Sequence, residues 1–140
     1  MIKTFKYLFK RTPVLINPKE GYELWSQSYN DEQNPVRKLS IDSLNQLMPN
    51  LINARVLDIG CGTGYFSRAA FKQQAQNVVG IDLSFGMVEK ARTCSADSQL
   101  CFINGNAEYL PFSNESFDVI ICSLVLAHLP SIRLSMSEMS

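Results

Sequence analysis

Short apolar runs alternate with segments of helical periodicity through most of the chain. The runs are continuous rather than alternating with polar residues, which is typical of strands that are buried on both faces. They predict four strands, over Arg55–Ile59, Asn77–Leu83, Gln99–Asn104 and Phe117–Cys122. Strand–helix–strand alternation of this kind predicts an α/β fold, with a doubly wound, Rossmann-like parallel sheet joined by right-handed crossovers.

The helices are predicted from apolar positions spaced three or four residues apart. One follows Pro35 and ends at Pro49, with its apolar face formed by Val36, Leu39, Leu44, Leu47, Met48 and Leu51. Others are predicted over about 64–74, after the capping residue Ser84, and over 131–140, where Ile132, Met136 and Met139 share a face. A short helix is also predicted around 20–29. We therefore divide the chain into an N-terminal segment, 1–35, and a domain, 36–140.

Composition narrows the class of protein. The chain has 140 residues, 46% of them hydrophobic, and 13 basic side chains balance 13 acidic ones. These values are ordinary for a globular fold, and zero net charge argues against a dedicated nucleic-acid binder. The longest apolar stretch, 119–127, is too short to span a membrane. The four cysteines form no CxxC pair, so we expect reduced thiols, no metal site and a cytoplasmic location.

The first eleven residues are basic and contain no acidic side chain, with Lys3, Lys6, Lys10 and Arg11 in the segment MIKTFKYLFKRTPVLI. This segment lacks the apolar core and cleavage site of a secretory signal. A solvated terminus is one interpretation. A weak peripheral contact with a membrane surface is the other.

A glycine-rich segment, DIGCGTG, follows the first predicted strand. Glycines at positions 60, 62 and 64 allow a sharp turn and place backbone N–H groups toward an anionic ligand group. Close packing of helix against strand would also favour glycine here. The segment is not a dinucleotide fingerprint, because Tyr65 and Ser67 stand where that pattern needs glycine, and it is not a P-loop.

Asp82 ends the second predicted strand, 18 residues after Gly64. A carboxylate at a strand tip at about this distance suits a bidentate hydrogen bond to the two hydroxyls of a ribose. Its alternative role is to cap the following helix, which Ser84 is placed to do instead. The spacing therefore favours ribose binding.

Four motifs in order, DIGCGTG, VVGIDLS, NGNAEYLPF and FDVIICSLVLAHLP, resemble those of the Rossmann-like (class I) S-adenosylmethionine-dependent methyltransferases. The chain is most similar to the group that includes ubiquinone/menaquinone-biosynthesis and malonyl-carrier-protein methyltransferases. The resemblance covers about residues 20–140. It implies S-adenosylmethionine as cofactor, an N-terminal helical lid, and a seven-strand sheet of which only the first four strands are present. We therefore expect a methyltransferase that is truncated at the C-terminus.

The resemblance also implies roles for individual residues. The methionine part of the cofactor is assigned to Asp58, Gly60, Gly62 and Gly64; the ribose to Asp82; the adenine to Leu83, Met87, Asn106 and Ala107; the transferring methyl to Ser123; and the lid to Tyr29, in the spacing Trp25-x-x-x-Tyr29. Members of the family often have aspartate where this chain has Asn106. The asparagine carbonyl also accepts a hydrogen bond, so we expect weaker adenine recognition. Glu108 is expected to brace the same loop.

The catalytic residue stays unknown, with His128 as a candidate. It follows the fourth predicted strand and is either a general base toward an acceptor hydroxyl or a cap for the helix near Ser131. The leading hypothesis is methyl transfer from S-adenosylmethionine to a small-molecule or carrier-bound acceptor. One alternative is a catalytically silent S-adenosylmethionine-binding module. A nicotinamide-dependent oxidoreductase is disfavoured by Tyr65 and Ser67.

Overall fold

The structure is a computed structural model that describes residues 17–31, 34–95, 97 and 99–140. The basic arm, and with it the predicted peripheral membrane contact, lies outside the described residues.

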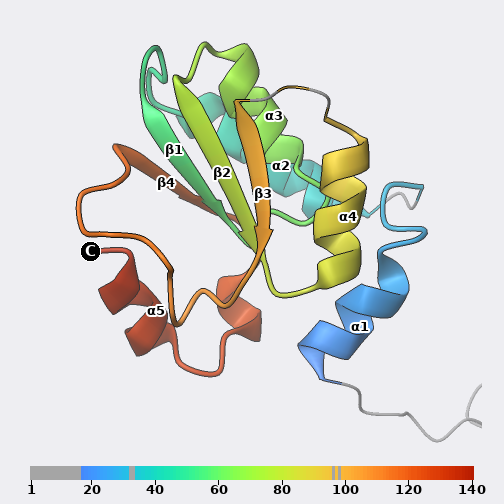
Figure 1. Cartoon of the computed structure of the whole chain (residues 1–140). Helices are drawn as coiled ribbons and strands as arrows, with labels where there is room; N and C mark the ends of the chain where they lie inside the picture. Colours follow the sequence, from blue (N-terminus) through green and yellow to red (C-terminus); the bar gives the residue numbers. More distant parts are fainter. Residues whose placement is uncertain (1–16, 32–33, 96, 98) are drawn as a thin grey trace, which may run out of the picture.

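Four parallel strands form a single sheet in the order β3-β2-β1-β4 (Figure 1). Their bounds are Arg55–Ile59 for β1, Asn77–Asp82 for β2, Leu100–Asn104 for β3 and Val119–Cys122 for β4. The parallel, Rossmann-like sheet is confirmed, and the chain reverses its direction of travel across the sheet between β1 and β4. Ligands of such sheets bind beyond the carboxyl ends of the strands at this switch point. At the edge of this sheet, β4 is apolar, with the sequence VIIC.

The helices are α1 (Pro18–Trp25), α2 (Pro35–Leu47), α3 (Tyr65–Lys72), α4 (Phe85–Thr93) and α5 (Ile132–Glu138), and a 3-10 turn, η2, spans Leu126–His128. The sheet face that carries Val56 and Val78 packs on Ala70 of α3, and Phe102 of the same face packs on α4. The opposite face, with Leu57 and Ile81, is covered by residues 107–129 and Met139 after α5. Figure 1 shows α1 standing apart from the sheet, below the end of α4.

The core explains why the strands pair in this register. Val56, Leu57, Ile59, Val78 and Ile81 are each at most 1% exposed. Burying a side chain of this kind contributes about 1.5–3 kcal/mol relative to leaving it in water. A one-residue slip of a strand would turn these side chains to the opposite face, so the apolar runs select one register.

Asparagine and serine side chains define where the helices begin. Asn17 and Asn34 accept hydrogen bonds from the first turns of α1 and α2, each of which starts with proline. Ser84 caps α4 as predicted, since its hydroxyl accepts from the Met87 N–H. Ser131 caps α5 in the same way. The prediction that His128 caps this helix is therefore wrong.

Three predicted helices differ from the structure in position or in the face they bury. The first helix begins at Pro18 and ends at Trp25, because Asn17 and Pro18 form a better start than Glu20, and residues 26–31 form turns. In α2, Val36, Leu39 and Leu47 are exposed, and nothing in the described part of the chain covers them.

In the last helix, as in α2, the predicted apolar face is not the buried one. In α5 the buried residue is Ser135, whereas Ile132 and Met136 of the predicted apolar face are about half exposed. The spacing of apolar residues along a helix shows which of its faces favours burial. It does not supply the surface that buries it.

Candidate active site

The glycine-rich loop joins β1 to α3 and lies against the end of β2. Gly60, Gly62 and Gly64 have φ angles of 65°, 52° and 80°, a region that side chains with a Cβ rarely adopt. The loop is held to the sheet because the N–H groups of Gly60 and Cys61 donate to the Ile81 carbonyl. These hydrogen bonds fix the conformation of the glycine loop.

Asp82 lies at the end of β2, and its carboxylate joins the glycine loop to the start of α4. One carboxylate oxygen accepts a 2.8 Å hydrogen bond from the Gly62 N–H, and the other accepts a 2.9 Å bond from the Ser84 N–H. Burial raises the pKa of this carboxyl, while the two N–H donors act in the opposite direction. Each oxygen keeps a further lone pair, so the carboxylate is still able to accept from a ligand hydroxyl.

Asp58 lies beneath the loop rather than beside the cleft. It is 1% exposed, and the Ser67 hydroxyl donates to its carboxyl at 2.6 Å. Burial raises the pKa of Asp58 to about 7, and the hydrogen bond from Ser67 opposes that shift. The carboxyl supports the loop and the start of α3 from below.

A cleft opens beyond the carboxyl ends of the strands, at the switch point between β1 and β4. Its open space, including the part that merges with solvent, is about 860 Å³. Nine of the eleven predicted cofactor residues line it: Tyr29, Gly60, Gly62, Asp82, Leu83, Met87, Asn106, Ala107 and Ser123. Asp58 and Gly64 do not. The structure therefore brings together residues that are separated by up to 94 positions along the chain.

The segment after β3 forms one wall and is braced by its own side chains. The Asn106 side-chain oxygen accepts from the Glu108 N–H at 3.0 Å. Glu108 is 8% exposed and accepts from the Ser131 N–H at 2.8 Å, which ties this wall to the start of α5. Glu108 braces the loop, as expected, and Asn106 keeps one lone pair of its oxygen for a ligand.

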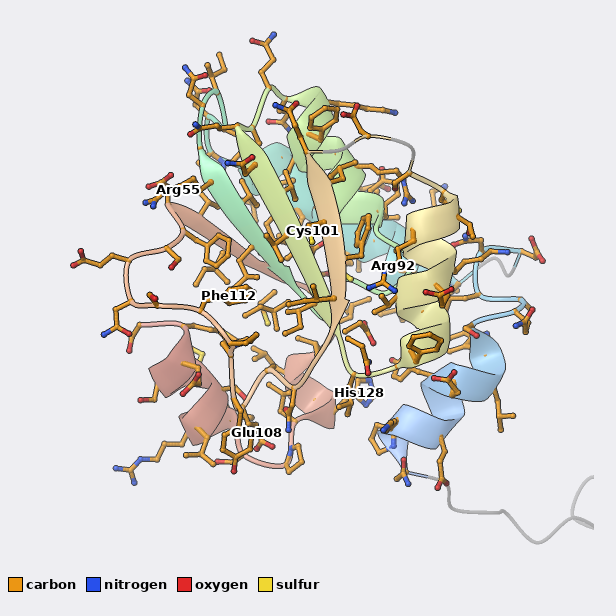
Figure 2. All side chains as sticks on the ribbon, viewed as in Figure 1. Arg55, Arg92, Cys101, Glu108, Phe112 and His128 are labelled. Atoms are coloured by element: carbon orange, nitrogen blue, oxygen red, sulfur yellow. The ribbon has the colours of Figure 1, made fainter. Side chains whose placement is uncertain are left out.

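His128 stands at the mouth of the cleft, opposite α1. Figure 2 shows it below the carboxyl ends of the strands and beside that helix. Its Nε2 atom lies 3.0 Å from the Tyr22 hydroxyl, and the two rings meet edge to face with centroids 5.4 Å apart. Burial raises the pKa of Tyr22. The pair closes one side of the mouth.

A second hollow lies on the other side of the glycine loop. It is lined by Arg37, Ser40, Gly62, Ser123 and Tyr29, among others. The Arg37 guanidinium lies 5.1 Å from the centre of the Tyr29 ring, and the Ser40 and Ser123 hydroxyls are 2.6 Å apart. Through these contacts α2 reaches the loop after β4.

Sequence reasoning missed Tyr22, Arg37 and Lys19, which line the two hollows. Tyr22 lies three residues before Trp25 and on the same helix face as it, so helical spacing was an available signal. Arg37 carried no signal in the sequence, because only the packing of α2 brings it to the glycine loop.

The cleft brings together a carboxylate, apolar side chains and an open stretch of backbone. Asp82 lies at its base, beside the apolar side chains of Met87 and Leu83. At Gly62 an added Cβ would meet only the Tyr29 ring, at 4.0 Å, so the backbone there is open to a ligand. These features define a Rossmann-like protein with a cleft beyond the carboxyl ends of its strands.

The particular family follows from comparison with known proteins. Residues 57–140 match the methyltransferase domain family, and the chain belongs to that family. It is 36% identical over 89 residues to the uncharacterized methyltransferase YcgJ of Bacillus subtilis, covering 61% of this chain and 35% of that protein. It is 35% identical over 115 residues to the malonyl-[acyl-carrier protein] O-methyltransferase of Erwinia pyrifoliae, covering 81% and 42%. The chain thus spans less than half the length of these relatives.

Solved structures agree with this assignment. The S-adenosylmethionine-dependent methyltransferase from Mesorhizobium loti superposes with a TM-score of 0.62 and 32% identity, over 66% of this chain and 43% of that one. The crystal structure of YcgJ gives a TM-score of 0.66 and 31% identity, over 73% and 44%. The family match supports the methyltransferase hypothesis and not the nicotinamide-dependent oxidoreductase.

Two further observations concern the described residues alone. None of their helices combines the length and the apolar character needed to cross a membrane. Within the same residues, no group of three or more histidine, cysteine or acidic side chains is arranged to hold a metal ion.

Proposed function

We propose that this chain is the cofactor-binding part of an S-adenosylmethionine-dependent methyltransferase. The observation that carries the proposal is the partly buried Asp82 carboxylate, held between the glycine loop and the start of α4 at the base of the cleft. A carboxylate in that place suits the two hydroxyls of a ribose. The match to the methyltransferase domain supports the same ligand.

The proposal assigns the cofactor to the predicted residues. Asp82 holds the ribose; Leu83 and Met87 pack on the adenine; Asn106 and Ala107 meet its edge. Gly60, Gly62 and Gly64 shape the loop that receives the methionine part, and Asp58 supports that loop from below through Ser67. Ser123 lies between the two hollows, at the place proposed for the transferring methyl.

Arg37 is added to this set on grounds of charge. Among the described side chains that line the second hollow, it is the one cation. An amino-acid carboxylate favours a cationic partner, and the Arg37 guanidinium, beside the glycine loop, supplies one. We therefore assign the methionine carboxylate to this side of the loop.

The bound cofactor would supply a methyl group on a positively charged sulfur, which is already activated for transfer. The protein then has to orient donor and acceptor and exclude water, and such orientation contributes on the order of 7–11 kcal/mol. Tyr22, Tyr29 and His128 enclose the mouth of the cleft and serve that purpose. His128 is the proposed general base, because its imidazole lines the cleft and imidazole is the commonest general base of enzymes.

The acceptor is proposed to be a small molecule or a carrier-bound acyl group. Several relatives are malonyl-[acyl-carrier protein] O-methyltransferases, and the chain covers 36% to 44% of the length of those from Hamiltonella defensa, Pectobacterium atrosepticum and Erwinia species. The segment 1–35 is proposed as arm and lid, and 36–140 as the cofactor domain. The unpaired thiols of the four cysteines support a cytoplasmic location.

Calorimetric titration with S-adenosylhomocysteine tests the proposal, with NAD as the competing ligand. Binding of the first and not the second is the expected result. Binding of NAD alone would overturn it. Incubating the chain, and a longer form that includes any further residues of its gene, with labelled S-adenosylmethionine and a metabolite extract then separates an active enzyme from a silent binding module.

A further inference from the structure

Glu23 extends from α1 to the first turn of α4. One of its carboxylate oxygens accepts a 2.9 Å hydrogen bond from the Gly86 N–H, and the other accepts a 2.8 Å bond from the Ser84 hydroxyl. The first N–H groups of a helix have no partner within it and carry partial positive charge. Glu23 supplies both the acceptor and the negative charge, and these hydrogen bonds lower its pKa.

Position 86 is shaped for this contact. A Cβ placed there would lie 2.6 Å from the Ser26 hydroxyl oxygen and 2.9 Å from a Glu23 carboxylate oxygen. Ser26, which follows α1 directly, is 2% exposed. A side chain at position 86 would therefore require the Ser26 and Glu23 side chains to shift.

The contact continues into the cleft through Ser84. The Ser84 hydroxyl donates to Glu23 while its own backbone N–H donates to Asp82, the carboxylate proposed to hold the ribose. On the other side, Glu23 follows Tyr22, which lines the cleft and meets His128. A displacement of Glu23 would therefore move the wall formed by α1 away from the base formed by Asp82.

We propose that Glu23 is a positioning residue that anchors α1 on α4 and thereby sets the affinity of the cleft for the cofactor. This inference rests on the proposed function for its ligand, but the anchoring itself does not. Ser84 already caps the Met87 N–H of α4, so the acceptor that Glu23 provides for Gly86 adds to an existing cap. The Glu23 carboxylate also joins two elements that are 61 residues apart in sequence.

Trp25 allows the anchoring to be measured without any ligand. It is the only tryptophan of the chain, it ends α1, and its ring lies 4.8 Å from that of Tyr29. We expect Glu23→Ala to increase quenching of Trp25 fluorescence by acrylamide, and to weaken S-adenosylhomocysteine binding about tenfold, within the range for losing charge-assisted hydrogen bonds. Glu20→Ala, an exposed carboxylate on the same helix, is the matched control and is expected to change neither.

Gly86→Ala tests the same contact from the other helix. Alanine favours a helix over glycine, so α4 itself is not weakened. We nevertheless expect the same increase in quenching and the same loss of affinity as in Glu23→Ala, and no further loss when the two changes are combined. Additive effects in the double variant would overturn the proposal, as would unchanged Trp25 quenching or unchanged affinity in Glu23→Ala. Failure of the wild-type chain to bind S-adenosylhomocysteine would instead refute the proposed function, and the quenching data would still decide the anchor.

Discussion

The Asp82 carboxylate accepts a hydrogen bond from the Gly62 N–H at 2.8 Å, across 20 residues of sequence. This bond joins the tip of β2 to the glycine loop after β1. The two motifs that the sequence presents separately, DIGCGTG and VVGIDLS, therefore form one structural unit at the base of the cleft. Loss of the carboxylate affects both the proposed ribose contact and the shape of the loop.

Replacing Asp82 with alanine is expected to abolish cofactor binding. At about 100 times its dissociation constant, a ligand stabilises the folded chain by about 2.7 kcal/mol. We expect S-adenosylhomocysteine to produce such a gain in wild-type thermal unfolding and none in Asp82→Ala. Asp42→Ala, an exposed residue of α2, serves as control and should retain the gain. A retained shift in Asp82→Ala would remove this residue from the site.

Asp58 is expected to make the stability of the fold depend on pH. Its pKa is about 7 in the folded chain and about 3.9 when unfolded, so the folded state holds the extra proton between these values. Stability therefore falls as pH rises from about 4 to about 7, by on the order of 4 kcal/mol, and the loss is complete above that range. Urea unfolding of Asp58→Asn should show this part of the pH dependence removed, with the variant gaining relative to wild type as pH rises.

Ser67→Ala provides the matched change for Asp58. The Ser67 hydroxyl donates to the carboxyl and lowers its pKa, so its loss should extend the window of falling stability to higher pH. If Asp58→Asn and wild type lost stability in parallel with rising pH, the dependence would belong to other groups.

Two glycines of the loop are expected to differ in their tolerance of a side chain. Gly62→Ala should cost about 1 kcal/mol of unfolding free energy, because φ is 52° but the added Cβ meets only Tyr29, at 4.0 Å. Gly64→Ala should cost more, since its Cβ would lie 2.8 Å from the Phe102 ring. Gly62→Asn should cost less than Gly62→Ala, because asparagine tolerates this conformation better. Equal losses at the two positions in urea unfolding would contradict the packing described here.

Two variants distinguish a role of His128 in proton transfer from a role of its hydrogen bond with Tyr22. With an acceptor found in the extract screen, we expect His128→Gln to lower kcat about 100-fold or more, as for loss of a general base, with little change in S-adenosylhomocysteine affinity. Tyr22→Phe removes the same hydrogen bond but leaves the imidazole, and should lower kcat far less. Equal effects of both variants would assign His128 to closing the cleft rather than to proton transfer.

The amino-acid sequence by itself determined the parallel sheet, the glycine loop and the acid at the tip of β2. Each depends on local information: continuous apolar runs, glycines at positive φ, and a cap such as Ser84 next to a strand end. The order of the strands, β3-β2-β1-β4, was established by the structure.

Tertiary structure alone decided which side chains meet across the cleft. The hydrogen bond between Tyr22 and His128 spans 106 residues, and the contacts of Glu23 with α4 span about 60, so no local pattern encodes them. Tertiary packing also placed Arg37 beside the glycine loop and left the apolar face of α2 exposed. The spacing of apolar and polar residues along the chain indicates which side chains favour burial or pairing. Which partner each one finds depends on how the whole chain packs.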